Sequence, residues 1–448
     1  MNDTIAAIST ALGVGAISII RVSGLDSISI VNKITKSKKL LQYKSHTINY
    51  DHIVENDKVI DEVLISIMKS PKTFTKEDIV EVNCHGGIAT TNKVLELLLT
   101  NGCRLALPGE FSKRAFLNGR IDLIEAEGIM DLINAKTDKS LKLAINQVSG
   151  KVSNLIKDLR DKIVQIIANI EVNIDYPEYE DVLVITNEMI KENISIIEEN
   201  IKEILKKSEN SKIINEGISV AIIGRPNVGK SSLLNALLEE SKAIVTEIEG
   251  TTRDFVEGTI NLDGIMLNLI DTAGIRKTKD VVESIGINKS KELIDKASLI
   301  LFLLNNNEEM NDEEKEIYEL LKDKNYIIVV NKSDLEKKLI IEDDNKVLVS
   351  AKTGFGLEDL KNKIKEKYNL ETIETDDLTY LSSARSISLL RQALESVNDV
   401  KKALELDTPI DLIEIDLKNI WEILGSIIGA NYEDELIDQL FSRFCLGK

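Results

Sequence analysis

The chain has 448 residues, of which 43% are hydrophobic and 29% are charged, and these proportions are typical of soluble globular proteins. The net charge of −19 argues against non-specific binding of nucleic acid over the whole surface. Residues 1–118 nevertheless carry a balance of +2, against −21 for the remainder, so we expect any direct contact with RNA in this first third.

The composition also bears on location and on redox chemistry. No stretch approaches about eighteen uncharged apolar residues, and the N-terminal residues lack the basic segment of a secretory signal. We therefore expect a cytoplasmic protein with no membrane contact. Cys84, Cys103 and Cys445 are too few and too scattered to predict a disulfide framework or a metal site.

The first third is expected to form an α+β domain. A strand-like run over residues 17–22 contains Arg21, a further strand is expected over residues 60–68, and a helix over residues 89–99. Strands and helices alternate here without a recurring crossover pattern. His85, in the sequence NCHGG, is typical of a loop residue, and the pattern alone predicts no site there.

Residues 122–209 are expected to be helical throughout. Apolar residues recur there at spacings of three and four, which is the pattern of long amphipathic helices with core-facing stripes. The stripes consist of Val152, Leu155, Ile156, Leu159, Ile163, Ile166, Ile167 and Ile170, and of Ile190, Ile194, Ile197, Ile201 and Leu205. The same spacing returns at Ile387, Leu390, Leu394, Val397, Val400 and Leu404, and continues beyond Pro409.

A helical layer that stops, admits a complete α/β domain and then resumes suggests a domain insertion. The connections at residues 215–217 and 369–377 are the candidate hinges. At this length two to four domains are expected. We predict an N-terminal α+β domain over residues 1–118, a helical domain over residues 119–215 plus 370–448, and an inserted P-loop α/β domain over residues 216–369.

The inserted domain opens with a phosphate-binding pattern. The apolar β-rich run 218–223 is followed by GRPNVGKS, which fits G-x-x-x-x-G-K-S, and then by a helical pattern. Gly224 and Gly229 let the backbone N–H groups turn toward phosphate oxygens, and the following helix adds its positive N-terminal end. Lys230 is expected to reach the β and γ phosphates, and the Ser231 hydroxyl to bind Mg²⁺.

Further motifs follow, each at the end of an expected strand. Residues 259–262 and 265–270 form an expected hairpin that leads into DTAG, and the strand over residues 326–330 leads into NKSD. The Asp334 carboxylate can accept two N–H bonds from guanine, which adenine cannot offer. Because ligands of open α/β sheets bind at the carboxyl ends of the strands, the order of the motifs predicts a GTP site.

The loop over residues 246–254 is expected to sense the γ phosphate, with Thr252 as the second hydroxyl on Mg²⁺. Ile275 stands where many small GTPases carry a water-orienting Gln. Hydrolysis then needs a different carboxylate or amide, and a positive charge other than an arginine finger. The full set expected to bind GTP is Asn227, Val228, Gly229, Lys230, Ser231, Ser232, Thr246, Glu247, Ile248, Glu249, Gly250, Thr251, Thr252, Asp271, Thr272, Ala273, Gly274, Asn331, Lys332, Ser333, Asp334, Ser350, Ala351 and Lys352.

The motifs NVGKSS, EGTTRD, DTAGIR and NKSD together resemble the translation-factor-related GTPases that carry a hydrophobic residue in place of the Gln. Within that group, some members hold K⁺ beside the phosphates, and the ion acts as the missing finger. The residues that match this K⁺ site are Asn227, Thr246, Ile248 and Thr251.

The whole chain resembles the bacterial and organellar tRNA modification GTPases of the MnmE (TrmE) family. The residues that carry this resemblance are ALGVGAISIIRVSG, TKEDIVEVNCHGG, PGEFSKRAFLNGRIDLIEAEGIMDLI and the C-terminal FSRFCLGK. The resemblance implies a homodimer that works with a flavin-dependent partner protein and tRNA in a hetero-oligomer. It also implies 5-carboxymethylaminomethyl-type modification at C5 of the wobble uridine, with 5-formyl- or methylene-tetrahydrofolate as the one-carbon donor.

The resemblance assigns further residues. The tetrahydrofolate site matches Arg21, Glu81, Arg120 and Lys448, with Arg120 standing where some members have Lys and Thr10-Ala11 where Thr-Pro is common. Glu283 matches a carboxylate that acts through water in hydrolysis, and Cys445 a cysteine needed for modification. Together with Asn227 and Thr252, they make up the expected catalytic set. The resemblance further implies that K⁺-dependent dimerisation of two GTPase domains drives hydrolysis.

Two other functions are compatible with a GTP site. A ribosome-assembly switch would need no chemistry beyond GTP hydrolysis, but the N-terminal third and the CLGK tail argue against it. A dynamin-like membrane scaffold would need a basic amphipathic or apolar anchor, which the sequence does not show.

Overall fold

The computed structural model describes residues 3–175, 187–240, 256–270, 287–368, 370, 378–430 and 434–447. The chain separates into two compact units, one of residues 1–130, 153–193 and 395–448 and the other of residues 131–152 and 194–394. Each unit is described by itself, and the predicted three-part division stays a prediction. The predicted γ-phosphate loop, DTAG, Glu283, Lys448 and most of the hinge over residues 369–377 lie outside the described residues.

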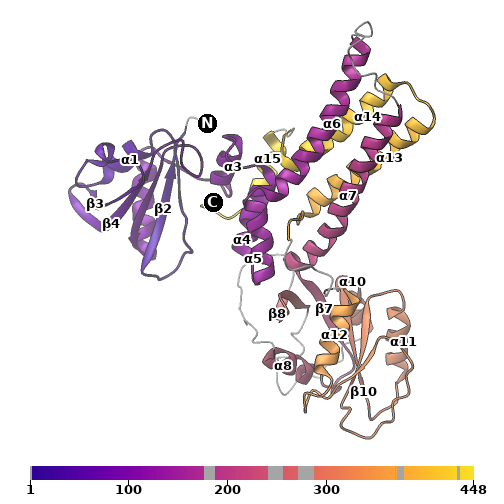
Figure 1. Cartoon of the computed structure of the whole chain (residues 1–448). Helices are drawn as coiled ribbons and strands as arrows, with labels where there is room; N and C mark the ends of the chain where they lie inside the picture. Colours follow the sequence, from indigo (N-terminus) through magenta and orange to yellow (C-terminus); the bar gives the residue numbers. More distant parts are fainter. Residues whose placement is uncertain are drawn as a thin grey trace. The chain divides into compact units, whose positions relative to one another are not determined.

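The N-terminal sheet has the strand order β3-β4-β5-β2-β1-β6, with β1 and β6 parallel and the other neighbours antiparallel. Its strands confirm the predicted strands over residues 17–22 and 60–68, and α2 confirms the predicted helix. The elements are β1 (Ile5–Ile8), β2 (Ile17–Ser23), α1 (Ser27–Ile34), η1 (Leu40–Gln42), β3 (Thr47–Glu55), β4 (Lys58–Met68), β5 (Ile79–His85), α2 (Ile88–Thr100), β6 (Arg104–Leu105) and α3 (Glu110–Leu117) (Figure 1).

Alternation along the strands gives this sheet two different faces. On one face, Ile20, Val22, Val80 and Val82 are buried in a core with residues of α1 and α2. The intervening residues, Arg21 among them, point to the other face, where β2 pairs Arg21 with Glu81 of β5. The sheet therefore places two charged side chains, both predicted to bind a ligand, directly opposite each other.

His85 was expected in a loop, and this expectation was wrong. It is the last residue of β5, and its backbone N–H and ring Nδ1 lie 2.8 and 2.7 Å from the carboxylate oxygens of Asp61. The hydrogen bond that the exposed His85 ring donates to the Asp61 carboxylate raises the pKa of His85. The partner is a residue of β4, and no local pattern around His85 could have revealed it.

The described residues confirm the long helical pattern after residue 122, except that two breaks interrupt it between residues 134 and 151. Thr137 is the N-cap of a new helix and forms a capping box with Ser140, and a further break follows Val148. Stripe residues such as Val152, Ile163 and Ile194 are buried, as predicted. The helices are α4 (Leu123–Asn134), α5 (Asp138–Val148), α6 (Lys151–Asp175), α7 (Asn187–Glu216), α13 (Ala384–Glu405), α14 (Ile410–Ile428) and α15 (Asp434–Phe441) (Figure 1).

Among the described helices, none is both long enough and apolar enough to span a membrane. The longest, α7, carries charged residues along its length, as does α6. Their apolar residues form stripes rather than continuous apolar surfaces, which is the pattern of helices that pack on one side.

The second sheet has the order β12-β11-β10-β7-β9-β8 and is parallel except for the β8–β9 hairpin. That hairpin was predicted, and it turns through Asp263 and Gly264, which both have positive φ. The strands are β7 (Ile218–Ile223), β8 (Val256–Leu262), β9 (Ile265–Ile270), β10 (Leu299–Asn305), β11 (Tyr326–Asn331) and β12 (Lys346–Leu348), and the helices are α8 (Lys230–Glu240), α10 (Ile287–Lys296), α11 (Asp312–Leu321) and α12 (Leu357–Lys367) (Figure 1).

The central strands β10 and β11 are buried along their whole length, as expected for parallel strands covered on both faces. One face packs in a core with residues of α8 and α12, and the other packs with residues of α10 and α11. The carboxyl ends of β7, β10 and β11 therefore meet at one edge of the sheet, where the predicted nucleotide motifs begin.

Gly217 connects α7 to β7 and has a φ of 77°. A Cβ at this position would overlap the backbone oxygen of Met266. We expect Gly217→Ala to lower the free energy of unfolding by about 1–3 kcal/mol, because both strain and overlap oppose the side chain. Urea denaturation of the full chain measures this loss.

The matched control for this substitution is Gly354→Ala. Gly354 has a similar φ of 80°, but no described atom lies within 4 Å of a Cβ built there. We expect the control to lose less stability than Gly217→Ala, because only the backbone strain remains. Equal losses in the two variants would contradict the role given to the Met266 contact.

Candidate functional site

The loop after β7 has the backbone shape that a phosphate-binding loop requires. Gly224, Asn227 and Gly229 have φ values of 153°, 65° and 100°. A Cβ on Gly224 would lie 2.5 Å from the Leu303 backbone oxygen, and one on Gly229 would overlap the amide nitrogen of Asn331. Side chains at these two glycines are therefore excluded by the ends of β10 and β11, as well as by the backbone.

Lys230 is the first residue of α8, directly after this loop, and it is only 7% exposed. Its Nζ donates to the backbone oxygens of Gly224 and Arg225, at 2.7 and 3.3 Å. The ammonium group is thereby held across the loop, at the N-terminal end of α8. Ser231 and Ser232 follow in the first turn of that helix and are exposed. This arrangement confirms the predicted sequence of strand, loop and helix.

Asn331 links two of the predicted nucleotide motifs. Its Nδ2 donates to the Val228 backbone oxygen at 2.8 Å, and its Oδ1 accepts from the Ala351 N–H at 3.1 Å. Both ends of the buried amide are thus used to connect the phosphate-binding loop with residues 350–352. That Asn331 also contacts GTP stays a prediction.

Asp334 is exposed near the same edge, and its Oδ1 accepts from the Ser350 hydroxyl at 2.7 Å. This hydrogen bond lowers the pKa of Asp334, with the nearby Lys352 and Lys332 adding to the effect. The group is therefore a carboxylate at neutral pH and offers acceptor oxygens to a base. Lys332 adopts a φ of 61°, which turns the chain between β11 and Asp334.

A second cluster of charged and aromatic side chains lies in the N-terminal domain. Arg21 pairs with Glu81 at 2.8 Å, and its guanidinium carbon lies 5.7 Å from the centroid of the Phe111 ring. Arg120 lies over the ring of Phe74 at 5.4 Å. Both rings belong to one apolar cluster with Ile5, Ala7 and Ala106. The structure therefore brings Arg21 and Glu81 into contact and places Arg120 on the same aromatic cluster.

The C-terminal tail reaches this cluster. The Gly447 backbone oxygen accepts from Arg21 Nη1 at 3.4 Å and from the Ser9 hydroxyl at 3.1 Å. Lys448, the remaining predicted ligand, follows directly but lies outside the described residues. Cys445 is exposed, whereas Cys84 and Cys103 are buried, and burial raises the pKa of the Cys103 thiol to about 12. Of the three thiols, only that of Cys445 is accessible.

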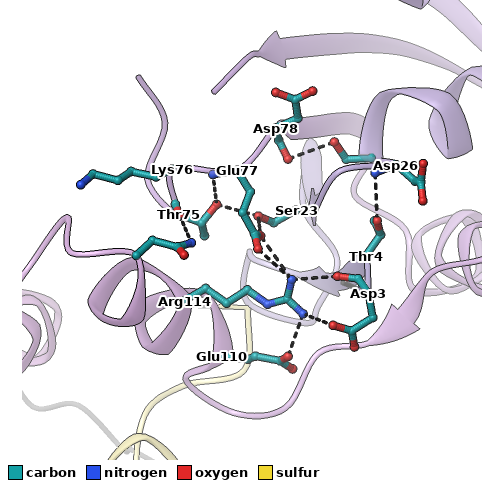
Figure 2. Close-up of polar contacts among 12 residues, drawn as sticks. Asp3, Thr4, Ser23, Asp26, Thr75, Lys76, Glu77, Asp78, Glu110 and Arg114 are labelled. Carbon is teal, nitrogen blue, oxygen red and sulfur yellow. Dashed lines mark hydrogen bonds and ion pairs between the residues drawn. The ribbon is translucent and has the colours of Figure 1, made fainter. Parts of the chain in front are cut away.

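Helix α3, which carries Phe111, also carries Arg114 and Glu110 of a polar network (Figure 2). Arg114 is 1% exposed, and its guanidinium contacts Glu77 at 3.1 Å, Glu110 at 3.1 Å and Asp3 at 2.8 Å. Burial would raise the pKa of Glu110, but hydrogen bonds from Arg104, the Leu107 N–H and Arg114 outweigh it and lower the pKa. The network fastens α3, which carries Phe111, to the start of the chain and to the segment before β5.

Sequence reasoning missed several members of these sites. Phe74 and Phe111 stand in the quoted segments TFTKED and PGEFSKR, but nothing in the local pattern shows that the two rings share one cluster. Arg114 gave no signal either, because its three carboxylate partners are distant or on another turn. Glu77 and Asp3 are 37 and 111 residues away in the sequence.

Comparison with known proteins decides the family. The sequence model described as GTP-binding protein TrmE N-terminus matches residues 4–120, and that described as MnmE helical domain matches residues 123–445. The tRNA modification GTPase MnmE of Bacillus cytotoxicus is 52% identical over 100% of this chain and 99% of its own length. This chain belongs to the MnmE family of tRNA modification GTPases. The MnmE protein of Streptococcus thermophilus is 51% identical over 100% of this chain and 98% of its own length.

The family matches confirm the expected fold class of N-terminal α+β domain, helical domain and P-loop GTPase domain. The full-length relatives also confirm that this MnmE-family chain is a GTPase of tRNA modification. Among solved structures, the match to the G domain of the T. maritima FeoB iron transporter covers 34% of this chain and 98% of that chain, at 25% identity and a TM-score of 0.23.

In this MnmE-family chain, Asp334→Asn tests the assignment of the base pocket. The substitution replaces one acceptor oxygen with a donor, so we expect weaker GTP binding and better binding of xanthosine nucleotides. Competition between the two nucleotides for the purified chain measures the change. An unchanged preference for guanine would show that Asp334 does not contact the base.

Proposed function

We propose that this chain hydrolyses GTP while an aminomethyl-type group, of the 5-carboxymethylaminomethyl kind, is installed at C5 of the wobble uridine of tRNA. A flavin-dependent protein is the proposed partner, in the cytoplasm. The observation that carries the proposal is the identity of 52% with a tRNA modification GTPase along the full chain. Two parts of the structure support the proposal. The loop after β7, at the carboxyl ends of β10 and β11, is the proposed GTP site, and the Arg21 cluster is the proposed tetrahydrofolate site.

GTP fits the first site by its backbone geometry. A glycine-rich loop with three positive φ values and a buried lysine across it can surround phosphate oxygens with N–H groups and one ammonium group. Ser231, exposed at the first turn of α8, would hold Mg²⁺, with Thr252 as its proposed second ligand. The metal would supply positive charge at the β and γ phosphates.

Asn227 is the described member of the proposed K⁺ site. It is exposed in the phosphate-binding loop with a φ of 65°, and its amide oxygen would be one ligand of the ion. Thr246, Ile248 and Thr251 would complete the site and Glu283 would place the water. K⁺ would supply the charge that an arginine finger gives elsewhere. Closure of two GTPase domains of a homodimer around this ion is part of the proposal.

GTP turnover in K⁺ and in Na⁺ tests this mechanism. We expect at least about tenfold faster turnover in K⁺, the factor that 1.4 kcal/mol of barrier lowering provides. Asn227→Ala should remove the difference between the two ions while GDP binding is retained. Equal turnover of the unmodified chain in both salts would contradict the role of the ion.

Tetrahydrofolate fits the second site by the chemistry of its side chains. Two aromatic rings with a guanidinium group over each, next to a carboxylate, suit a flat ligand that carries hydrogen-bonding edges and a negative charge. Arg21, Glu81, Arg120 and Lys448 would hold it. The folate would supply the one-carbon unit, and the accessible thiol of Cys445 would serve the modification near the tail that Arg21 contacts.

Arg21→Ala should weaken binding of 5-formyl-tetrahydrofolate by about tenfold or more, because one charged contact is lost. Isothermal titration of the full chain measures the affinity. Lys93→Ala is the control, since Lys93 lies on α2 and pairs with Glu55 and Glu96 instead. Unchanged affinity of Arg21→Ala would exclude the cluster as the folate site.

Mass spectrometry of tRNA nucleosides tests the function itself. In cells that lack this chain, we expect the C5-modified wobble uridine to disappear, and we expect it to return when the chain is supplied. A normal nucleoside profile without the chain would refute the proposed modification, and it would leave the GTPase without a known output.

A further inference from the structure

Arg225, the second residue of the phosphate-binding loop, points away from the loop toward two carboxylates. Its Nη2 pairs with Glu308 Oε2, and its Nε lies 3.2 Å from Glu314 Oε1. Glu308 follows β10, and Glu314 lies in the first turn of α11. The Arg225 side chain is 22% exposed and that of Glu314 is 3% exposed, so the second pair is shielded from solvent.

Both carboxylates are held in place by other groups. The second oxygen of Glu308 accepts from Asn305 Nδ2 at 2.6 Å. Glu314 forms a capping box with Asn311, in which its Oε2 accepts from the Asn311 N–H at 3.1 Å. Burial raises the pKa of Glu314, and the charge of Arg225 opposes that shift. Glu308 and Glu314 are therefore both held by other residues, and they give the Arg225 side chain two fixed partners near the carboxyl end of β10.

The backbone of Arg225 faces the nucleotide site. Its carbonyl oxygen accepts from Lys230 Nζ at 3.3 Å, next to the stronger contact of Lys230 with Gly224. Arg225 thus contacts Glu308 and Glu314 through its side chain and Lys230 through its carbonyl oxygen. Lys230 is the residue that is expected to reach the phosphates. Any movement of the Arg225 side chain would shift the place where Lys230 is anchored.

We propose that Arg225 is a positioning residue for GTP hydrolysis, which holds the phosphate-binding loop and Lys230 through its ion pairs with Glu308 and Glu314. The proposal rests on the assignment of the loop to GTP. It excludes the role of an arginine finger for this residue. An arginine is required because a planar guanidinium can meet two separate carboxylates at once, whereas a lysine ammonium is a single point of charge.

The test measures GDP affinity, the KM for GTP and kcat for five single variants of the full chain and for one double variant. The single variants are Arg225→Ala, Arg225→Lys, Glu308→Gln, Glu314→Gln and the control Glu313→Gln. Gln can replace Glu in a capping box, so Glu314→Gln keeps the helix start intact. Glu313 is exposed in the same turn of α11, whereas the ion pairs of Arg225 are formed with Glu308 and Glu314. Thermal unfolding verifies that each variant is folded.

We expect Arg225→Ala to weaken GDP binding and raise the KM by about tenfold, with kcat at saturating GTP within about threefold of the unmodified chain. Arg225→Lys, Glu308→Gln and Glu314→Gln should each show part of this loss, and the control none. The double variant Arg225→Ala with Glu308→Gln should bind GDP no more weakly than Arg225→Ala alone, because the two residues form one interaction.

Two results would overturn the proposal. Normal GDP affinity in both glutamine variants, Glu308→Gln and Glu314→Gln, would show that the ion pairs do not position the loop. A loss of about a hundredfold in kcat for Arg225→Ala, with GDP affinity unchanged, would show that Arg225 acts on the nucleotide as a finger. Failure of the unmodified chain to bind GDP would instead refute the assignment of the site.

Discussion

The nucleotide site depends on the close approach of the phosphate-binding loop to the ends of β10 and β11. Gly229 has no room for a side chain because the amide of Asn331 occupies that space, and the same amide bonds Val228 and Ala351. The two hydrogen bonds of this buried amide stabilise the fold, because a buried amide without partners would bear the full cost of desolvation. Asn331 therefore connects the phosphate-binding loop with residues 350–352, and these are the two parts proposed to bind the phosphates and the base of GTP.

The Arg21 cluster depends on a different kind of support. Arg114 is buried, and its carboxylate partners come from the chain start, from the segment before β5 and from α3 itself. Removing Arg114 would take one positive partner away from both Glu77 and Glu110, whose side chains are shielded from solvent, and this is unfavourable. This network holds α3 so that Phe111 lies under Arg21, and the tail that carries Cys445 meets the same arginine. Residues near both ends of the chain thus contact this cluster.

Much of the local structure could be predicted from the sequence, because buried helix faces and buried strands have characteristic patterns of apolar residues. The hairpin over β8 and β9, the apolar run of β11 and the stripes of α6 and α7 were predicted for this reason, whereas β10 was not predicted. The strand order of the N-terminal sheet was not predicted, since pairing between distant strands depends on tertiary packing. Arg225 illustrates the same limit: its place in the loop was evident, but its partners lie more than 80 residues away.

The central claim is that the proposed GTP site and the Arg21 cluster serve one modification reaction. The most direct measurement is the amount of C5-modified wobble uridine in cells whose only copy of this chain is either Asp334→Asn or Arg21→Ala. We expect each variant to lose the modified uridine, although purified Asp334→Asn still binds 5-formyl-tetrahydrofolate and purified Arg21→Ala still binds GDP. Normal modification in either strain would contradict the claim that both sites are needed.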